Sequence, residues 1–106
     1  MPKYLIQANY VGEGVKGLLK DGGTSRRAAV ANLFQSQGGA MEAFYYAFGE
    51  TDCYVIGDLP DNASMAAVAL TIGASGVVAV KTTVLLTPEE IDEATKKTPS
   101  YRAPGK

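Results

Sequence analysis

Apolar and polar residues alternate near the start of the chain. From residue 3 to residue 10 one side is apolar, with Tyr4, Ile6, Ala8 and Tyr10, and the other is mixed, with Leu5, Gln7 and Asn9. A period of two predicts a β-strand. Residues 77–86 are also predicted as a strand, with the polar residues Lys81, Thr82 and Thr83 in its middle.

Residues 41–58 form the most aromatic stretch of the chain and predict a β-hairpin. Aromatic and β-branched residues favour strands, and the segment 49–52 (GETD) supplies turn residues between two such runs. We expect Asp52 to bond backbone N–H groups within that turn. We also expect Met41, Ala43 and Tyr45 to share one face of the first hairpin strand, with Phe44 and Tyr46 on the other.

Helical spacing marks the segments between the strands. A short helix is expected over 12–20, and a second begins with Thr24 as its N-cap and ends at Gly38. Residues 62–75 predict a helix that is small or apolar almost all round, which is typical of burial on more than one side. A last short helix begins after Thr87, which caps it, and Pro88.

This order of elements predicts one α+β domain. It reads β-α-β-β-α-β with a short C-terminal helix, which is the ferredoxin-like arrangement with a four-stranded antiparallel sheet. Residues 1–95 are expected to form the domain, and residues 96–106 an extended tail.

The aromatic hairpin also predicts an assembly. One face of such a sheet carries the helices and the other stays open, yet neither face of this hairpin is polar. Three large aromatic side chains left in water would forgo roughly 5–9 kcal/mol of burial. We therefore expect two copies to pack sheet to sheet as a dimeric α+β barrel, so that the chain's main partner is itself.

Composition excludes several classes of function. The net charge of −1 gives no basic surface for nucleic acid, and no apolar run reaches the roughly 18 residues that span a bilayer. Because strand-like residues begin at the first positions, we expect no secretory leader. The chain has no histidine and one cysteine, Cys53, which removes histidine relays, imidazole or thiolate metal sites and internal disulfides. We expect no nucleic acid, membrane, metal or cofactor partner, and a cytoplasmic location.

The segment 22–27 (GGTSRR) is a candidate anion site. Free N–H groups at a helix start, two hydroxyls and the guanidinium groups of Arg26 and Arg27 all favour a carboxylate or phosphate. The alternative is that both arginines form ion pairs with Asp21, Glu42 or an acid of a partner chain.

A second candidate site joins the two end strands of the sequence. Gln7, Asn9, Lys81 and Thr83 would be polar groups on the open face, with a hydroxyl from Tyr46 or Tyr45. An apolar cavity with a few convergent polar groups is the usual form of a small-molecule site. The alternative is that these polar groups satisfy buried backbone or hold water at a dimer seam.

Four segments resemble the GYD domain family, a bacterial and archaeal family. They are MPKYLIQANY at 1–10, GVKGL at 14–18, GGTSRR at 22–27 and KTTVLLTPEE at 81–90. The family is named for a Gly-x-Tyr-Asp turn, and this chain has Thr51 where that motif has tyrosine. The resemblance implies the same fold and dimeric barrel, and it implies no particular activity.

Three functions are compatible with the sequence. The first is a homo-oligomeric protein that binds a small, partly apolar metabolite in the barrel, anionic if the arginines take part. The second is a cofactor-independent enzyme of the monooxygenase or isomerase type, which would use Asn9, Lys81 and a tyrosine. The third is a structural oligomerisation module in which the alanine-rich helix joins dimers.

Overall fold

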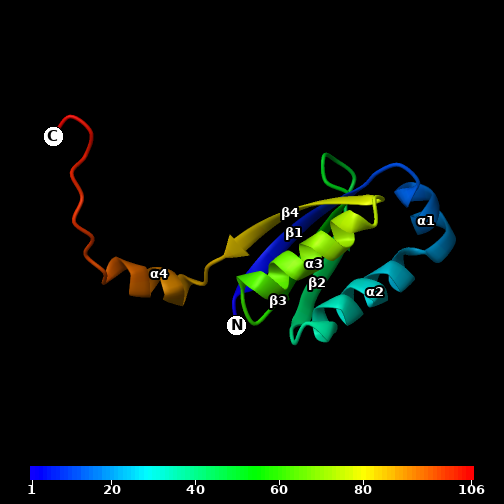
Figure 1. Cartoon of the computed structure of the whole chain (residues 1–106), viewed down its shortest axis with the longest axis horizontal. Helices are drawn as coiled ribbons and strands as arrows, with labels where there is room; N and C mark the ends of the chain where they lie inside the picture. The colour runs from blue at the N-terminus through cyan, green and yellow to red at the C-terminus, as the bar shows by residue number, and fades with distance from the viewer.

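The strands form one antiparallel sheet in the order β2-β3-β1-β4 in the computed structural model, which describes all 106 residues (Figure 1). The elements follow one another as β1 (Lys3–Tyr10), α1 (Gly14–Asp21), α2 (Gly23–Ser36), β2 (Ala40–Tyr46), β3 (Cys53–Asp58), α3 (Asn62–Ala74), β4 (Val78–Leu85) and α4 (Pro88–Thr95). This is the ferredoxin-like order, with α1 and α4 as additional helices. The predicted α+β class and four-stranded antiparallel sheet are confirmed.

β1 is a central strand, and its register decides which residues become neighbours. Gln7 lies opposite Tyr54 of β3 on one side and opposite Lys81 of β4 on the other. Both α2 and α3 lie on the same side of the sheet, which we call the helix face (Figure 1). The alternation in β1 buries Tyr4, Ile6 and Ala8 on that face. Leu5, Gln7 and Asn9 lie on the other side, which we call the open face.

The hydrophobic core lies between the helix face and the helices. It consists of Tyr4, Ile6, Ala8, Phe34, Cys53, Val55, Leu59, Met65 and Val68. Phe34 of α2 is fully buried and packs directly over Gly57 of β3, where an added Cβ would lie 2.4 Å from the ring atom Cε2 of Phe34. The missing side chain at Gly57 is therefore what lets α2 approach the sheet.

A β-bulge in β2 changes the faces that simple alternation predicts. The register shifts between Met41 and Ala43, so Met41 lies opposite Gly57 on the helix face while Ala43 lies opposite Ile56 on the open face. The expectation that Met41 shares a face with Ala43 is therefore wrong. Glu42 is the extra residue of the bulge.

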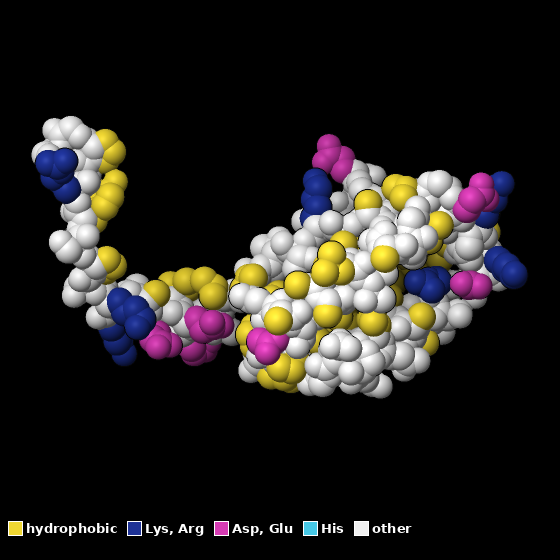
Figure 2. All heavy atoms as spheres, viewed as in Figure 1, with side chains coloured by type: hydrophobic (Ala, Val, Ile, Leu, Met, Phe, Trp, Pro, Cys, Tyr) yellow, Lys and Arg dark blue, Asp and Glu magenta, His cyan; other side chains and the backbone are white.

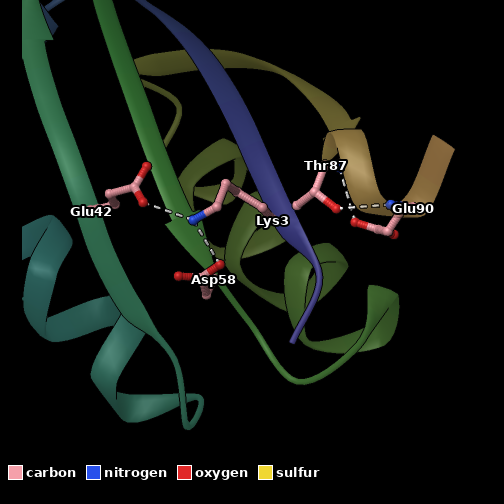
Figure 3. Close-up of polar contacts among 5 residues, drawn as sticks. All are labelled: Lys3, Glu42, Asp58, Thr87 and Glu90. Carbon is pink, nitrogen blue, oxygen red and sulfur yellow. Dashed lines mark hydrogen bonds and ion pairs between the residues drawn. The ribbon is translucent and has the colours of Figure 1, made fainter. Parts of the chain in front are cut away.

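The bulge brings Glu42 to an ion-pair cluster at one end of the open face. The Lys3 ammonium lies 2.9 Å from the carboxylate of Glu42 and 3.0 Å from that of Asp58 (Figure 3). These two hydrogen bonds raise the pKa of Lys3 above its ordinary value.

Side chains cap the starts of α3 and α4, whereas the start of α2 differs from the prediction. Asp61 caps α3 by accepting a hydrogen bond from the Ser64 N–H at 2.8 Å. Thr87 and Glu90 form a reciprocal capping box at the start of α4 (Figure 3). The predicted N-cap Thr24 is wrong, because α2 already begins at Gly23 after the backbone turns at Gly22, which has φ of 82°.

The alanine-rich helix α3 is buried on one side only in this chain. Met65 and Val68 are buried, whereas Leu70 is 73% exposed and most of its alanines face outward. The expectation of burial on several sides is not met by a single chain.

α4 and the residues after it stand away from the sheet and helices (Figure 1). No residue of α4 is buried. The radius of gyration is 17.0 Å, against about 13 Å for a compact chain of this length. None of the helices has the length and apolar character required to cross a membrane.

Candidate functional site

A polar pocket lies on the open face, where the ends of β1 and β4 meet the loop between β2 and β3. It has a volume of about 200 Å³ and is lined by Gln7, Asn9, Glu50, Thr51, Ala79, Val80 and Lys81. The direct pairing of β1 with β4 places Gln7 beside Lys81. Three of the predicted site residues, Gln7, Asn9 and Lys81, therefore do come together.

Hydrogen bonds fix the orientation of both amide side chains. Asn9 Oδ1 accepts from the Asp52 N–H at 2.8 Å, and Gln7 Oε1 accepts from the Thr51 hydroxyl at 3.1 Å. The oxygens are thus used to hold the loop, and the NH₂ groups of both amides have no partner within the chain. The alternative that these residues satisfy backbone groups holds for the oxygen of Asn9.

Asp52 holds the same loop against β1. Its carboxylate accepts a hydrogen bond from the Tyr10 N–H at 3.0 Å, and its own N–H also donates to the Ala8 carbonyl at 3.1 Å. The expectation that Asp52 closes the hairpin turn holds for its backbone carbonyl, which accepts from the Ala47 N–H at 2.8 Å, whereas its carboxylate bonds the end of β1. The loop is therefore a fixed wall of the pocket.

Lys81 supplies the positive charge of the pocket. Its side chain is exposed and forms no ion pair. Thr83 lies on the same face, opposite Leu5 and one step further along β4, and does not line the pocket. The pocket can therefore offer amide and ammonium donors to a carbonyl or carboxylate oxygen.

An apolar surface continues from this pocket across the open face. Leu5, Ala43, Tyr45, Tyr54 and Ile56 point to this side of β1, β2 and β3, as their registers require. Tyr45 is 71% exposed and Tyr54 is 39% exposed, so the surface is uncovered in the single chain.

Tyr46 lies on the helix face and not with the pocket. Its register opposite the buried Cys53 places it there, and its hydroxyl donates to the Gly23 carbonyl at 3.1 Å. Burial raises the pKa of Tyr46 to about 12, and the neighbouring Tyr10 adds to the rise. Of the two tyrosines considered for the open face, the structure places Tyr45 there.

Arg26 and Arg27 also lie on the helix face, where they point to different surfaces. Arg26 is half-buried between α2 and the sheet, whereas Arg27 is exposed beside Gly23 and Thr24. Neither arginine forms an ion pair within the chain, and Glu42, one of the expected partners, is bonded to Lys3. The predicted site residues therefore divide between two opposite faces of the sheet.

Thr51 and Glu50 are pocket residues that the sequence pattern does not indicate as site residues. Their only signal in the sequence is a run of polar residues in the hairpin turn, which is common in turns of any function. No group of three or more Cys, Asp or Glu side chains is positioned to hold a metal ion.

Comparison with known families adds one finding. The family model of the GYD domain matches residues 4–95, which covers most of the 106-residue chain. No curated protein and no solved structure matches the chain. With a match from the start of β1 to the end of α4, the chain belongs to the GYD domain family.

Proposed function

We propose that the protein is a cytoplasmic homodimer that binds a small, partly apolar molecule between the open faces of its two copies. The observation that carries this proposal is the continuity of the open face. A pocket with Gln7, Asn9 and Lys81 opens directly onto an apolar surface that includes Tyr45 and Tyr54.

Apolar burial supports the sheet-to-sheet dimer. The exposed face of an antiparallel sheet is normally polar, but here Leu5, Tyr45, Tyr54 and Ile56 share it. Burial of each large apolar side chain is favourable by roughly 1.5–3 kcal/mol. A second copy of the same face would cover these side chains and form the barrel.

The size of the pocket supports a site completed by the partner. A volume of about 200 Å³ is below the roughly 300–1,000 Å³ of small-molecule sites. A facing sheet would close the open side and enlarge the cavity. The ligand would place an oxygen on the Asn9 and Gln7 NH₂ groups and the Lys81 ammonium, and its apolar part on the tyrosines.

The enzyme alternative has less support. An enzyme would use Lys81 as its base or nucleophile, and this side chain is exposed in the single chain. The purely structural alternative predicts a dimer whose barrel is empty, so the mass of the native dimer distinguishes it from the ligand-binding function.

Native mass spectrometry of freshly purified protein tests the proposal. We expect a dimer that carries an additional small mass, which is released on denaturation. Lys81→Gln and Asn9→Asp should lower the occupied fraction, because each removes a donor worth about 10- to 100-fold in affinity. Asn9→Asp keeps the oxygen that accepts from Asp52, so the loop remains in place.

Lys16→Gln is the matched control, because Lys16 is an exposed lysine on α1, away from the pocket. It should leave the bound mass unchanged. An empty wild-type dimer would contradict ligand binding and favour the structural alternative. A mass that both pocket variants retain would place the ligand elsewhere.

A further inference from the structure

A groove separates α2 from α3 on the helix face. α2 packs on β2 and α3 packs on β4, so the central strands β1 and β3 form the floor between them. In Figure 2, which looks onto these helices, apolar side chains line the gap between α3 and α2. The inner part of the groove has a volume of about 80 Å³.

Small side chains explain why the groove is not filled. Ala8 of β1 and Cys53 of β3 form part of its floor, and Ala29 of α2 forms part of one wall. Larger residues at these positions would close the space between helices and sheet. The resulting hollow is apolar and large enough for a short hydrocarbon chain only.

Arg26 is the one charged residue that lines the inner part, and it also lines an outer part of about 380 Å³. Its guanidinium forms neither an ion pair nor a hydrogen bond within the chain. A half-buried guanidinium without a partner is a strong attractor for a carboxylate, which it can bind through two parallel hydrogen bonds.

Two acidic residues line the outer part and limit the charge of a ligand. Asp21 and Glu13 line it together with Arg26, and Glu13 is already paired with Lys16 at 3.3 Å. Basic and acidic side chains meet at the α1 end of the groove in Figure 2. Asp21 would repel a second negative charge on the ligand.

We propose that this groove binds a small monocarboxylate with an apolar chain. The carboxylate lies on Arg26, and the chain extends over Ala8 and Cys53 between the two helices. This site lies on the opposite face of the sheet from the Gln7–Lys81 pocket and does not depend on a dimer. It is therefore a second site, independent of the proposed barrel ligand.

Titration calorimetry with sodium hexanoate tests the site. We expect one saturable site per chain, with hexylamine and adipate binding at least tenfold more weakly because of their charges. Arg26→Gln should weaken hexanoate binding by about 10- to 100-fold, the effect of losing a charged hydrogen-bond donor. Arg27→Gln, which changes the neighbouring exposed arginine, should stay within about twofold of wild type.

Ala29 gives a second readout from the wall of the groove. Ala29→Leu narrows the groove without changing Arg26 and should also weaken hexanoate, which separates loss of the site from loss of the charge.

Two results would overturn this inference. One is the absence of saturable binding at millimolar hexanoate. The other is equal weakening by Arg26→Gln and Arg27→Gln, which would indicate general charge attraction. Lys81→Gln should leave hexanoate affinity unchanged and Arg26→Gln should leave the co-purified mass unchanged, so the two sites can fail separately.

Discussion

At the scale of single residues, Cys53 has the most unusual environment. Its side chain is 2% exposed, on the helix face of β3 and at the floor of the groove. Burial raises the pKa of its thiol to about 11, because the thiolate is poorly solvated there. Cys53 is therefore a packed thiol of low reactivity, and the sequence places no lysine or arginine next to it that would stabilise a thiolate.

The raised pKa of Cys53 predicts a loss of stability at alkaline pH. An unfolded chain releases this proton near pH 9, whereas the folded chain holds it up to about pH 11. The contribution of this thiol to the free energy of unfolding is thus fully present below pH 9. It falls by about 2–3 kcal/mol as pH rises toward 11. Urea unfolding of wild type and Cys53→Ala between pH 7 and pH 11 measures it.

The difference between the two proteins isolates the thiol. Tyr4, Tyr46 and Lys3 also have raised pKa values and weaken both proteins at high pH, so most of their effect cancels in the difference. The stability advantage of wild type over Cys53→Ala should shrink above pH 9. A constant advantage up to pH 11 would show that the thiol titrates alike in the folded and unfolded chains.

At the scale of secondary-structure elements, the contact between α2 and β3 decides how closely the helix approaches the sheet. Phe34 lies over Gly57, and the Ala40 carbonyl oxygen of β2 lies 3.0 Å from the position of an added Cβ. A close-packed core leaves no room for another carbon there. The glycine in β3 is thus explained by packing.

We expect Gly57→Ala to lower the free energy of unfolding by about 1–3 kcal/mol, because Phe34 would have to leave its position. Gly73→Ala in α3 is the matched control. An added Cβ at Gly73 meets nothing within 4 Å, so this variant should be neutral or more stable by up to about 1 kcal/mol. Denaturant unfolding compares them, and equal stability of Gly57→Ala and wild type would contradict the packing argument.

At the scale of the whole molecule, the chain leaves several surfaces without cover. The open face exposes Tyr45 and Tyr54, the outer side of α3 exposes Leu70, and α4 with the following residues stands away from the core. Of these surfaces, the open face is the one that continues into the Gln7–Lys81 pocket. The proposed dimer therefore rests on the open face.

A charge on that face should separate the proposed dimer. Tyr45→Asp would place a carboxylate in the interface and is expected to weaken association by about 2 kcal/mol, or roughly 30-fold. Leu19→Asp is the control, because Leu19 is 81% exposed on α1. Sedimentation velocity over a range of concentrations should show dissociation only for Tyr45→Asp. Wild type that remains monomeric, or a Tyr45→Asp dimer of unchanged affinity, would contradict the sheet-to-sheet dimer.

Local patterns in the sequence specify most of the fold. Period-two alternation predicts the bounds of β1, and the Asp61 cap and the Thr87–Glu90 capping box mark the starts of α3 and α4. These features depend on residues a few positions apart, which the chain order already specifies. The sequence also predicts that Gln7, Asn9 and Lys81 lie close together, because the ferredoxin-like order makes β1 and β4 neighbours.

Contacts between distant segments specify the rest. The bulge at Glu42 moves Met41 to the helix face, and the register opposite Cys53 places Tyr46 there as well. Thr51 and Asp52 reach Gln7 and Asn9 only because the loop folds over β1. Arg26 borders an open groove because α2 and α3 rest on different strands. Each of these features arises when segments far apart in the chain pack together, and the local pattern of a sequence does not specify such packing.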